Sequence, residues 1–328
     1  MKAMVFESKG SPLVLRELPV PEPDEDQVQI KIIACGICRT DLHVLDGELT
    51  QPKLPLVPGH EIIGIVTKTG SNVNDIKTGQ LVGVPWLGYT CGICKYCRKG
   101  KENLCENAKF TGYTIDGGYA EYTVAYAKYC FKLSEQYNNS ASAPLLCAGL
   151  IGFRSYRMID PSATNIGMYG FGAAAHILIQ IAKAQNKKVF AFTRDGDFKS
   201  QQFARGLGAH WVGGSSDVPG EKLDASIIFA PAGELIPKAL QDLDKGGTVI
   251  CGGIHMSEIP AFSYDLLWEE RSVRSVANLT REDGLNFFDL LQNVTVHTQT
   301  EFFPLNQAND AVEKLRKGQI KGAAVLVM

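Results

Sequence analysis

Four cysteines form the most regular chemical pattern in this sequence. Cys91, Cys94, Cys97 and Cys105 follow the spacing C-x₂-C-x₂-C-x₇-C. Thiolates this close together can fold one loop around a tetrahedral metal ion, and four sulfurs leave no open coordination position. The spacing therefore predicts a structural zinc in a lobe at residues 91–105, which stabilises the fold and does no chemistry.

One alternative for this lobe is a zinc ribbon that binds nucleic acid, since Lys95 and Arg98 lend it positive charge. Against this alternative, the lobe is single, and most of the chain would then have no assigned role. Four unrelated thiols would not show such regular spacing. The cysteines Cys35, Cys130 and Cys251 lack any ligand spacing, and we predict that they are packed thiols.

A glycine-rich turn near the middle of the chain indicates a dinucleotide site. Residues 170–175 read G-F-G-A-A-A and fit the pattern G-x-G-x-x-A. The missing side chains let the backbone approach a pyrophosphate at the N-terminus of the following helix. The string is weak alone, but it lies between a predicted strand and a predicted helix. We therefore predict that Gly170, Gly172 and Ala175 bind the cofactor.

The next strand ends in residues that bear on the choice of cofactor. An acid that binds the adenosine ribose of NAD is expected there, about 20 residues after the glycine-rich turn. This chain has Thr193-Arg194-Asp195. A hydroxyl and a guanidinium suit a 2′-phosphate better than a ribose diol, because arginine pairs with phosphate through a fork of two hydrogen bonds. NADP is therefore favoured, although Asp195 keeps NAD open if it folds inward.

Three further candidate ligands are scattered along the chain, so spacing alone does not pair them. Cys38 lies in G-I-C-R-T-D-L-H, a run rich in polar groups directly after a predicted strand. His60 lies in P-G-H-E, directly before another strand, and Cys147 lies in L-L-C-A-G. Rigid scaffolds often hold functional side chains at the ends of strands.

With these motifs in this order, the sequence resembles the zinc-containing medium-chain alcohol dehydrogenases. The family signature G-H-E-x₂-G-x₅-G appears as Gly59-His60-Glu61, with Gly64 and Gly70 completing it. The resemblance covers nearly the whole chain and is closest to the short microbial branch, with similarity also to cinnamyl-alcohol-type enzymes. It implies a zinc-dependent alcohol dehydrogenase or aldehyde reductase that transfers a hydride between an alcohol, aldehyde or ketone and a nicotinamide cofactor.

The resemblance implies that Cys38, His60 and Cys147 hold a catalytic zinc, the ligand set known for alcohol dehydrogenases, with the fourth position left for water or substrate. The substrate would react as a zinc-bound alkoxide, because zinc lowers the pKa of a bound hydroxyl. Asp41 is implied to orient His60. Glu61 is either an outer carboxylate or a transient ligand, and the sequence leaves both roles open.

The same resemblance assigns roles to residues around these ligands. Thr40 would bond the substrate oxygen and pass its proton, through cofactor hydroxyls, to His43; a helix cap and a surface histidine are the plainer alternatives. Arg39 resembles the family's cationic pyrophosphate contact, or is an ordinary surface arginine. Leu49 and Trp86 align with the substrate cleft, although core packing would also explain them. They favour short to medium primary alcohols or aldehydes, aromatic ones included.

The elements that must position these residues change character along the chain. The first third alternates apolar and polar residues, as at 28–32, and predicts strands. From Gly149 onwards strands alternate with helices, which predicts a doubly wound parallel sheet. We therefore expect a β-rich domain at 1–148 and 278–328 and a doubly wound α/β domain at 149–277. The resemblance implies that the first is a GroES-like catalytic domain and the second a Rossmann cofactor domain. The predicted strands are 28–32, 62–66, 119–124, 165–169, 188–192, 225–229, 248–251 and 323–327; the predicted helices are 173–184, 198–206 and 235–243.

The bulk composition limits the classes of partner. The chain has 328 residues, 45% hydrophobic and 21% charged, with a formal net charge of −2. Such a charge favours a small-molecule substrate over nucleic acid or a membrane surface. We expect a cytoplasmic protein, where its nine cysteines stay reduced. The family resemblance adds two zinc ions per chain and a homo-oligomer, dimer or tetramer. A quinone reductase without zinc and a non-catalytic zinc protein are the alternative functions.

Overall fold

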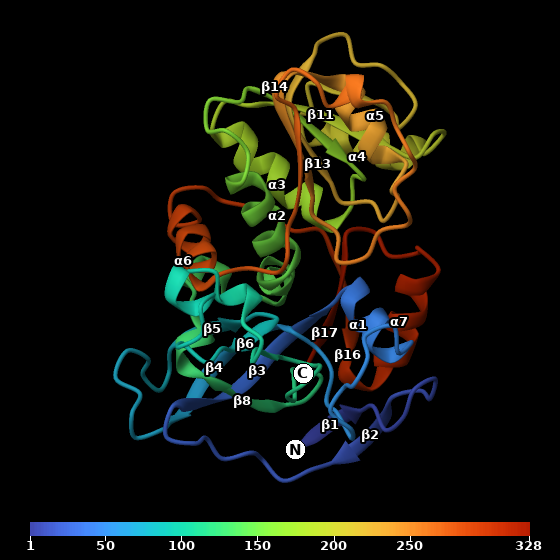
Figure 1. Cartoon of the computed structure of the whole chain (residues 1–328). Helices are drawn as coiled ribbons and strands as arrows, with labels where there is room; N and C mark the ends of the chain where they lie inside the picture. The colour runs from blue at the N-terminus through green and yellow to red at the C-terminus, as the bar shows by residue number, and fades with distance from the viewer. The chain divides into compact units, whose positions relative to one another are not determined.

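The computed structural model describes all residues, 1–328, and divides the chain into two compact units. Unit 1 contains Met1–Ala148 and Asn278–Met328, and unit 2 contains Gly149–Ala277. Figure 1 shows both in the colours of the chain, and both termini belong to unit 1. No helix combines the length and the apolar character that crossing a membrane requires.

Unit 1 is built on a sheet of seven strands with the order β16-β17-β3-β4-β5-β9, and β8 also pairs with β3. The central strand β3 (Gln27–Ile37) is eleven residues long and mostly buried, so the predicted strand at 28–32 is only its first half. β3 runs antiparallel to β4 (Glu61–Thr69), with Gly36 opposite Glu61. This register places the end of β3 beside the start of β4.

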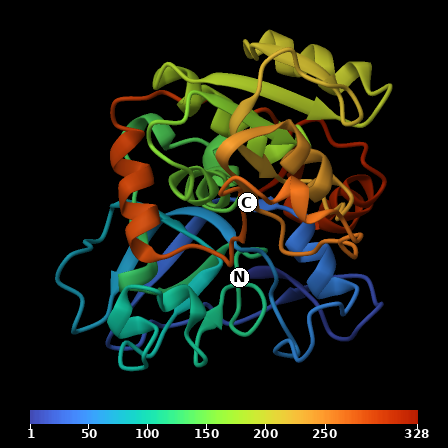
Figure 2. The ribbon, with the colours of Figure 1, turned by 45° about the horizontal axis from the view of Figure 1, so that its top comes forward.

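Shorter elements complete unit 1. In Figure 2 the orange-red helix α6 can be followed; it packs on β9, and the Phe131 ring fills the space beside Gly284, where a Cβ would lie 2.0 Å from the ring. The remaining strands are β1 (Lys2–Val5), β2 (Val14–Glu17), β5 (Leu81–Val84), β6 (Leu87–Tyr89), β7 (Lys109–Phe110), β8 (Tyr122–Tyr126), β9 (Phe131–Lys132), β16 (Thr300–Pro304) and β17 (Ala323–Val327). The helices are α1 (Arg39–Leu45), α6 (Arg281–Leu290), α7 (Ala308–Arg316) and the 3₁₀ turns η1 (Cys97–Lys99), η2 (Glu102–Leu104), η3 (Ala127–Tyr129), η4 (Glu135–Tyr137), η5 (Ser140–Leu146) and η7 (Leu305–Gln307).

Unit 2 is a parallel sheet of six strands with the order β12-β11-β10-β13-β14-β15. From β10 the strand order runs outward in both directions, as in a doubly wound fold, so the predicted α/β class is confirmed. Its elements are β10 (Asn165–Tyr169), α3 (Ala173–Ala184), β11 (Lys188–Thr193), α4 (Phe198–Gly206), β12 (Trp211–Gly214), β13 (Leu223–Ile228), α5 (Leu235–Asp242), β14 (Leu243–Cys251), η6 (Tyr264–Leu266) and β15 (Ser272–Ser275), preceded by α2 (Ala148–Arg157).

Differences from the predicted elements have local causes. The predicted strand at 119–124 begins at Tyr122 instead, because Ala120 forms an isolated bridge with Ala3 before the regular pairing starts. The short strands β12 and β15 were not predicted, since four residues carry too little periodicity to register. Cys35, Cys130 and Cys251 are buried free thiols, as predicted.

Candidate active site and metal centres

The structure brings three of the scattered candidate ligands together in unit 1. The Sγ of Cys38 lies 3.2 Å from Nε2 of His60 and 3.8 Å from Sγ of Cys147. Two zinc–sulfur bonds of about 2.3 Å at a tetrahedral angle separate the sulfurs by about 3.8 Å, and the matching sulfur–nitrogen edge is about 3.5 Å. The sulfur pair matches this geometry and is much too long for a disulfide.

The fold explains this convergence. Cys38 directly follows β3, and His60 directly precedes its antiparallel neighbour β4, so the two lie side by side at one end of the strand pair. Cys147 ends the 3₁₀ turn η5, which packs against β3 and β4. A sheet end and a packed turn therefore deliver residues that are 109 positions apart in the sequence.

The first turn of α1 supports two of these ligands. Cys38 caps the helix, and its Sγ accepts a hydrogen bond from the Thr40 N–H at 3.3 Å. Asp41 accepts from the Cys38 N–H at 2.8 Å and, through its other oxygen, from Nδ1 of His60 at 3.1 Å. A proton on Nδ1 leaves the Nε2 lone pair directed at the sulfurs. Asp41 is only 1% exposed, so this arrangement is shielded from water.

Glu61 completes the buried group. Its carboxylate and the donor atoms of the three ligands all lie within 4.8 Å of one another. The Oε2 atom is buried without a hydrogen-bond donor. Gly36 makes room for it, since a Cβ at Gly36 would lie 1.8 Å from Oε2. A buried carboxylate that has one oxygen without a donor and lies beside two sulfurs and an imidazole fits the neighbourhood of a cation.

The pKa shifts of the clustered side chains also fit a metal site. The hydrogen bond with Cys147 lowers the pKa of Cys38 well below its usual value, and the same bond together with burial raises the pKa of Cys147. Burial lowers the pKa of His60, but Asp41 and Cys38 outweigh it and hold this pKa well above the usual value. Burial also raises the pKa of Glu61. The buried acids outnumber the single buried base, and a bound divalent cation would favour their ionised forms.

The predicted relay residues lie on the same helix. Thr40 and His43 are three positions apart on α1, so both face one side of it, and both are half-buried. Nδ1 of His43 is hydrogen-bonded to the carboxylate of Glu48. Glu48 was not predicted from the sequence, because an acid five residues after a histidine matches no known motif. Arg39, at the start of α1, is exposed.

Trp86 stands edge-on against the metal-ligand candidate His60. Their ring centroids are 5.0 Å apart at an interplanar angle of 80°. The indole is stacked on Tyr113 at 5.6 Å and on Phe110 at 5.3 Å. Leu49 and Trp86 are both partly buried against the core of unit 1. The two stacking partners were not predicted, because each lies more than twenty residues from Trp86 and no local pattern links them to it.

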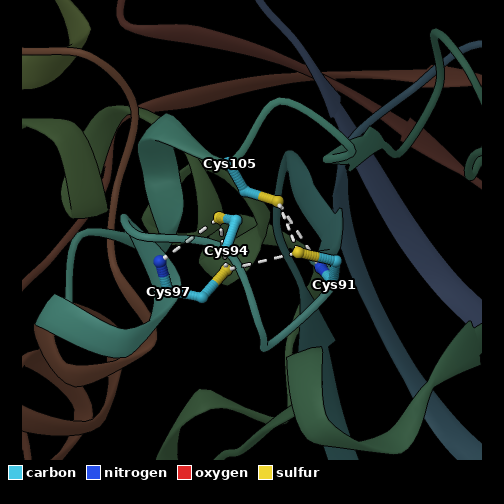
Figure 3. A group of neighbouring side chains, drawn as sticks. All are labelled: Cys91, Cys94, Cys97 and Cys105. Carbon is cyan, nitrogen blue, oxygen red and sulfur yellow. Dashed lines mark hydrogen bonds between the residues drawn. The ribbon is translucent and has the colours of Figure 1, made fainter.

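The four-cysteine lobe closes on itself, as Figure 3 shows. The Sγ–Sγ distances are 3.5 Å for Cys94–Cys97 and for Cys91–Cys105, and 4.0 Å for Cys91–Cys97. These values bracket the edge of about 3.8 Å expected for a tetrahedral zinc–thiolate site. Hydrogen bonds from the N–H groups of Ile93 and Cys94 lower the pKa of Cys91 to about 6, which favours its thiolate. An ion held by all four sulfurs would have no coordination position left for a substrate.

The glycine-rich turn of unit 2 joins β10 to α3. Gly170 has a φ of +92°, and a Cβ there would lie 2.8 Å from the N atom of Ala230. Gly172 is the N-cap of α3 and makes no side-chain cap, and no atom lies within 4 Å of the position that a Cβ would take there. Ala175 is fully buried. An uncovered helix N-terminus behind an open glycine backbone fits a pyrophosphate.

The end of β11 holds the residues predicted to select the cofactor. Thr193 is buried; its hydroxyl donates to the Arg194 carbonyl at 3.0 Å and accepts from the Gln201 side chain at 3.3 Å. The hydroxyl is thus engaged inside unit 2, while Arg194 is exposed. Asp195 is hydrogen-bonded to Ser216. The guanidinium is the group of this turn that remains open to a ligand.

A cavity of about 930 Å³ in unit 1 lies elsewhere. It is lined by α6, by residues 127–134 and by the loop at 72–76, and it includes none of the predicted site residues. Its walls mix apolar side chains with acids and bases, for example Phe288, Asp289 and Lys132. The donor cluster and this cavity share no residue.

Known proteins resemble the chain over its whole length. A model of the alcohol dehydrogenase GroES-like domain matches residues 24–135. A probable alcohol dehydrogenase of Mycobacterium tuberculosis is 42% identical over 316 residues, which are 94% of this chain and 91% of that protein. Among solved structures, a cinnamyl alcohol dehydrogenase of Sorghum bicolor superposes with a TM-score of 0.89 at 26% identity, over 99% of this chain and 97% of the other. An acetophenone reductase of Geotrichum candidum, solved with NAD, gives a TM-score of 0.87 at 30% identity, over 100% and 97%.

Proposed function

Because the chain belongs to the zinc-containing medium-chain alcohol dehydrogenases and is an alcohol dehydrogenase, we propose that its activity depends on a zinc ion held by Cys38, His60 and Cys147. The observation that carries this proposal is that the Cys147 sulfur and the His60 imidazole nitrogen both lie within 3.8 Å of Cys38 Sγ. Bound zinc would act as a Lewis acid, lowering the pKa of an alcohol hydroxyl or polarising a carbonyl. The other steps belong to residues of the chain.

These residues orient the ligands and move the proton. Asp41 holds the Nδ1 proton of His60 and so fixes the imidazole. Thr40 accepts the substrate hydroxyl proton as it gives up its own, and His43 passes the released proton to solvent with Glu48 as its hydrogen-bond partner. Glu61 would supply a fourth ligand, a carboxylate oxygen, in place of water, and its unpartnered Oε2 supports this role.

A second zinc is proposed in the four-cysteine lobe, where it would stabilise unit 1. The near-tetrahedral spacing of the sulfurs supports this assignment. The purified protein should then carry two zinc ions per chain. Elemental analysis after mild and after strong chelation tests the count, and a preparation that is fully active with one or no zinc per chain would contradict it.

NADP is the proposed cofactor, with the fingerprint glycines and Ala175 at the pyrophosphate, Arg39 as a cationic pyrophosphate contact and Arg194 as the fork that binds the 2′-phosphate. The exposed guanidinium directly after β11 supports this choice. Thr193 contributes by fixing the turn that carries Arg194. A comparison of kcat/KM for the two cofactors is the test, and a tenfold preference for NAD would refute the proposal.

Primary alcohols and aldehydes of short to medium length, aromatic ones included, are the proposed substrates. Leu49 and Trp86 are the proposed walls of the pocket, and the contact of Trp86 with His60 supports its place there. The names of the sorghum and Geotrichum proteins, a cinnamyl alcohol dehydrogenase and an acetophenone reductase, indicate aromatic substrates for those proteins. A panel of alcohols, aldehydes and ketones, followed at 340 nm with both cofactors, tests both the activity and the class. If the fully zinc-loaded protein turned over no member of the panel, the proposal would be wrong.

A homo-oligomer formed through unit 2 is proposed as the state in solution. β15 is an edge strand, whose outer N–H and C=O groups can pair with a second copy. Exposed apolar side chains are frequent in the segment that leads into β15, and exposed apolar patches mark interfaces. They are Ile254, Ile259, Phe262, Tyr264, Trp268 and Val273. Light scattering should give the mass of a dimer or tetramer, and a monomer at micromolar concentration would exclude it.

The cytoplasm is the proposed location, because two clusters of reduced thiols need a reducing compartment. Cell fractionation with an antibody against the chain tests this.

A further inference from the structure

Unit 2 carries an acid just after β11, Asp195, whose two carboxylate oxygens both accept hydrogen bonds from the chain. One oxygen of Asp195 accepts a hydrogen bond from the Ser216 hydroxyl at 2.7 Å. The other accepts from the Ser216 N–H at 3.2 Å and from the Ser215 hydroxyl at 3.4 Å. The carboxylate is therefore bonded to the turn that follows β12.

The sheet makes this contact possible. β12 lies parallel to β11 with Gly214 opposite Thr193, so the turns after both strands leave the same edge. A Cβ at Gly214 would lie 2.3 Å from Oδ1 of Asp195, so a glycine is required for the carboxylate to reach the turn. Asp217 fastens the same turn by accepting from the Gly214 N–H at 2.7 Å. The hydrogen bonds from Ser216 also lower the pKa of Asp195, so the group is held as a carboxylate.

This arrangement bears on how the two cofactors are told apart. An acid selects NAD by accepting hydrogen bonds from the ribose hydroxyls. Ser216 and Ser215 instead direct the Asp195 carboxylate toward the turn after β12, while the neighbouring Arg194 is exposed beside it. We propose that Ser216 is a specificity-determining residue, which holds Asp195 away from the ribose diol and thereby favours a dinucleotide with a 2′-phosphate. This inference rests on the proposed preference for NADP.

The test is the variant Ser216→Ala, with dissociation constants for NADPH and NADH measured by fluorescence and kcat/KM measured for both cofactors. Loss of the Ser216 hydroxyl frees Oδ2 of Asp195 and should shift both NADP/NAD ratios toward NAD by about five- to tenfold, mainly through tighter binding of NADH. Ser216→Thr keeps the hydroxyl and should keep the wild-type ratio. Adding Asp195→Asn to Ser216→Ala should cancel the gain in NADH affinity, because the acceptor itself is changed.

Ser162→Ala is the matched control, because it removes the same kind of contact from unit 2 away from the turn after β11. In the wild type, the N–H and the hydroxyl of Ser162 both donate to one oxygen of Asp160, at 2.8 and 2.6 Å. This control should leave both dissociation constants unchanged.

The outcomes separate the two ideas. A wild-type protein that binds NADH more tightly than NADPH overturns the proposed cofactor preference and, with it, this inference. A wild-type protein that prefers NADPH, with a ratio that stays within twofold in Ser216→Ala, overturns the role of Ser216 alone.

Discussion

Asp41→Asn isolates the contribution of the carboxylate behind the proposed zinc ligands. Asp41 makes two hydrogen bonds, to Nδ1 of His60 at 3.1 Å and to the Cys38 N–H at 2.8 Å. An asparagine of the same shape keeps one oxygen and turns an NH₂ group toward the other donor. At least one hydrogen bond to a charged group is then lost, about 1.5–3 kcal/mol, and a factor of ten corresponds to about 1.4 kcal/mol.

The expected result is therefore a loss of about ten- to a hundredfold in zinc affinity at this site. Competition with a chromogenic chelator measures the affinity, and kcat/KM measured at saturating zinc separates weaker binding from slower reaction. Asp46→Asn is the matched control: this residue caps the other end of α1 and forms only an exposed ion pair with Arg316, of about 0–1 kcal/mol. A zinc affinity of Asp41→Asn within twofold of the control would refute the orienting role of Asp41.

Three other perturbations test other parts of the molecule. Cys97→Ser should remove the zinc of the lobe and lower Tm by several degrees while the remaining zinc stays bound, measured by calorimetry with elemental analysis; an unchanged Tm would contradict a structural role. Gly170→Ala should weaken dinucleotide binding at least tenfold, because the residue has a φ of +92° and its Cβ would strike the backbone; titration calorimetry checks this, and unchanged affinity would exclude the fingerprint as the cofactor site. Lys188 and His210 hold the pKa of Glu221 at about 2 in the folded protein, so its contribution to stability is present above the unfolded pKa of about 4.3 and is lost as pH falls toward 2. Glu221→Gln should therefore lower Tm at pH 7 and approach the wild type as the pH falls below 4, and a constant difference across that range would be evidence against this ion pair.

The sequence predicted best those features that are made by neighbours in the chain. The four-cysteine lobe closes within a single loop, so its spacing carried the information. The strand, glycine-rich turn and helix at 165–184 lie where periodicity and glycine placed them, since each hydrogen bond of a helix and each face of a strand repeats at short range. The α/β fold class followed from the alternation of such elements, and the relatives and structural neighbours confirm it.

Family resemblance, and not spacing, associated Cys38 and His60 with Cys147. Nothing local in the sequence links residues 109 positions apart, and their meeting depends on the antiparallel pairing of β3 with β4 and on the packing of η5. The resemblance supplied the set because it carried tertiary information from folded relatives.

By itself, then, the sequence determined the local chemistry of this protein: a cysteine loop of metal-binding spacing, a glycine-rich turn that fits the dinucleotide pattern and a cation after β11. The tertiary structure decided which side chains contact one another. It paired His43 with Glu48, set Trp86 against His60 and tied Asp195 to Ser216. Such pairs depend on strand register and on side chains packed between distant segments, and these are fixed only when the whole chain has closed around its core.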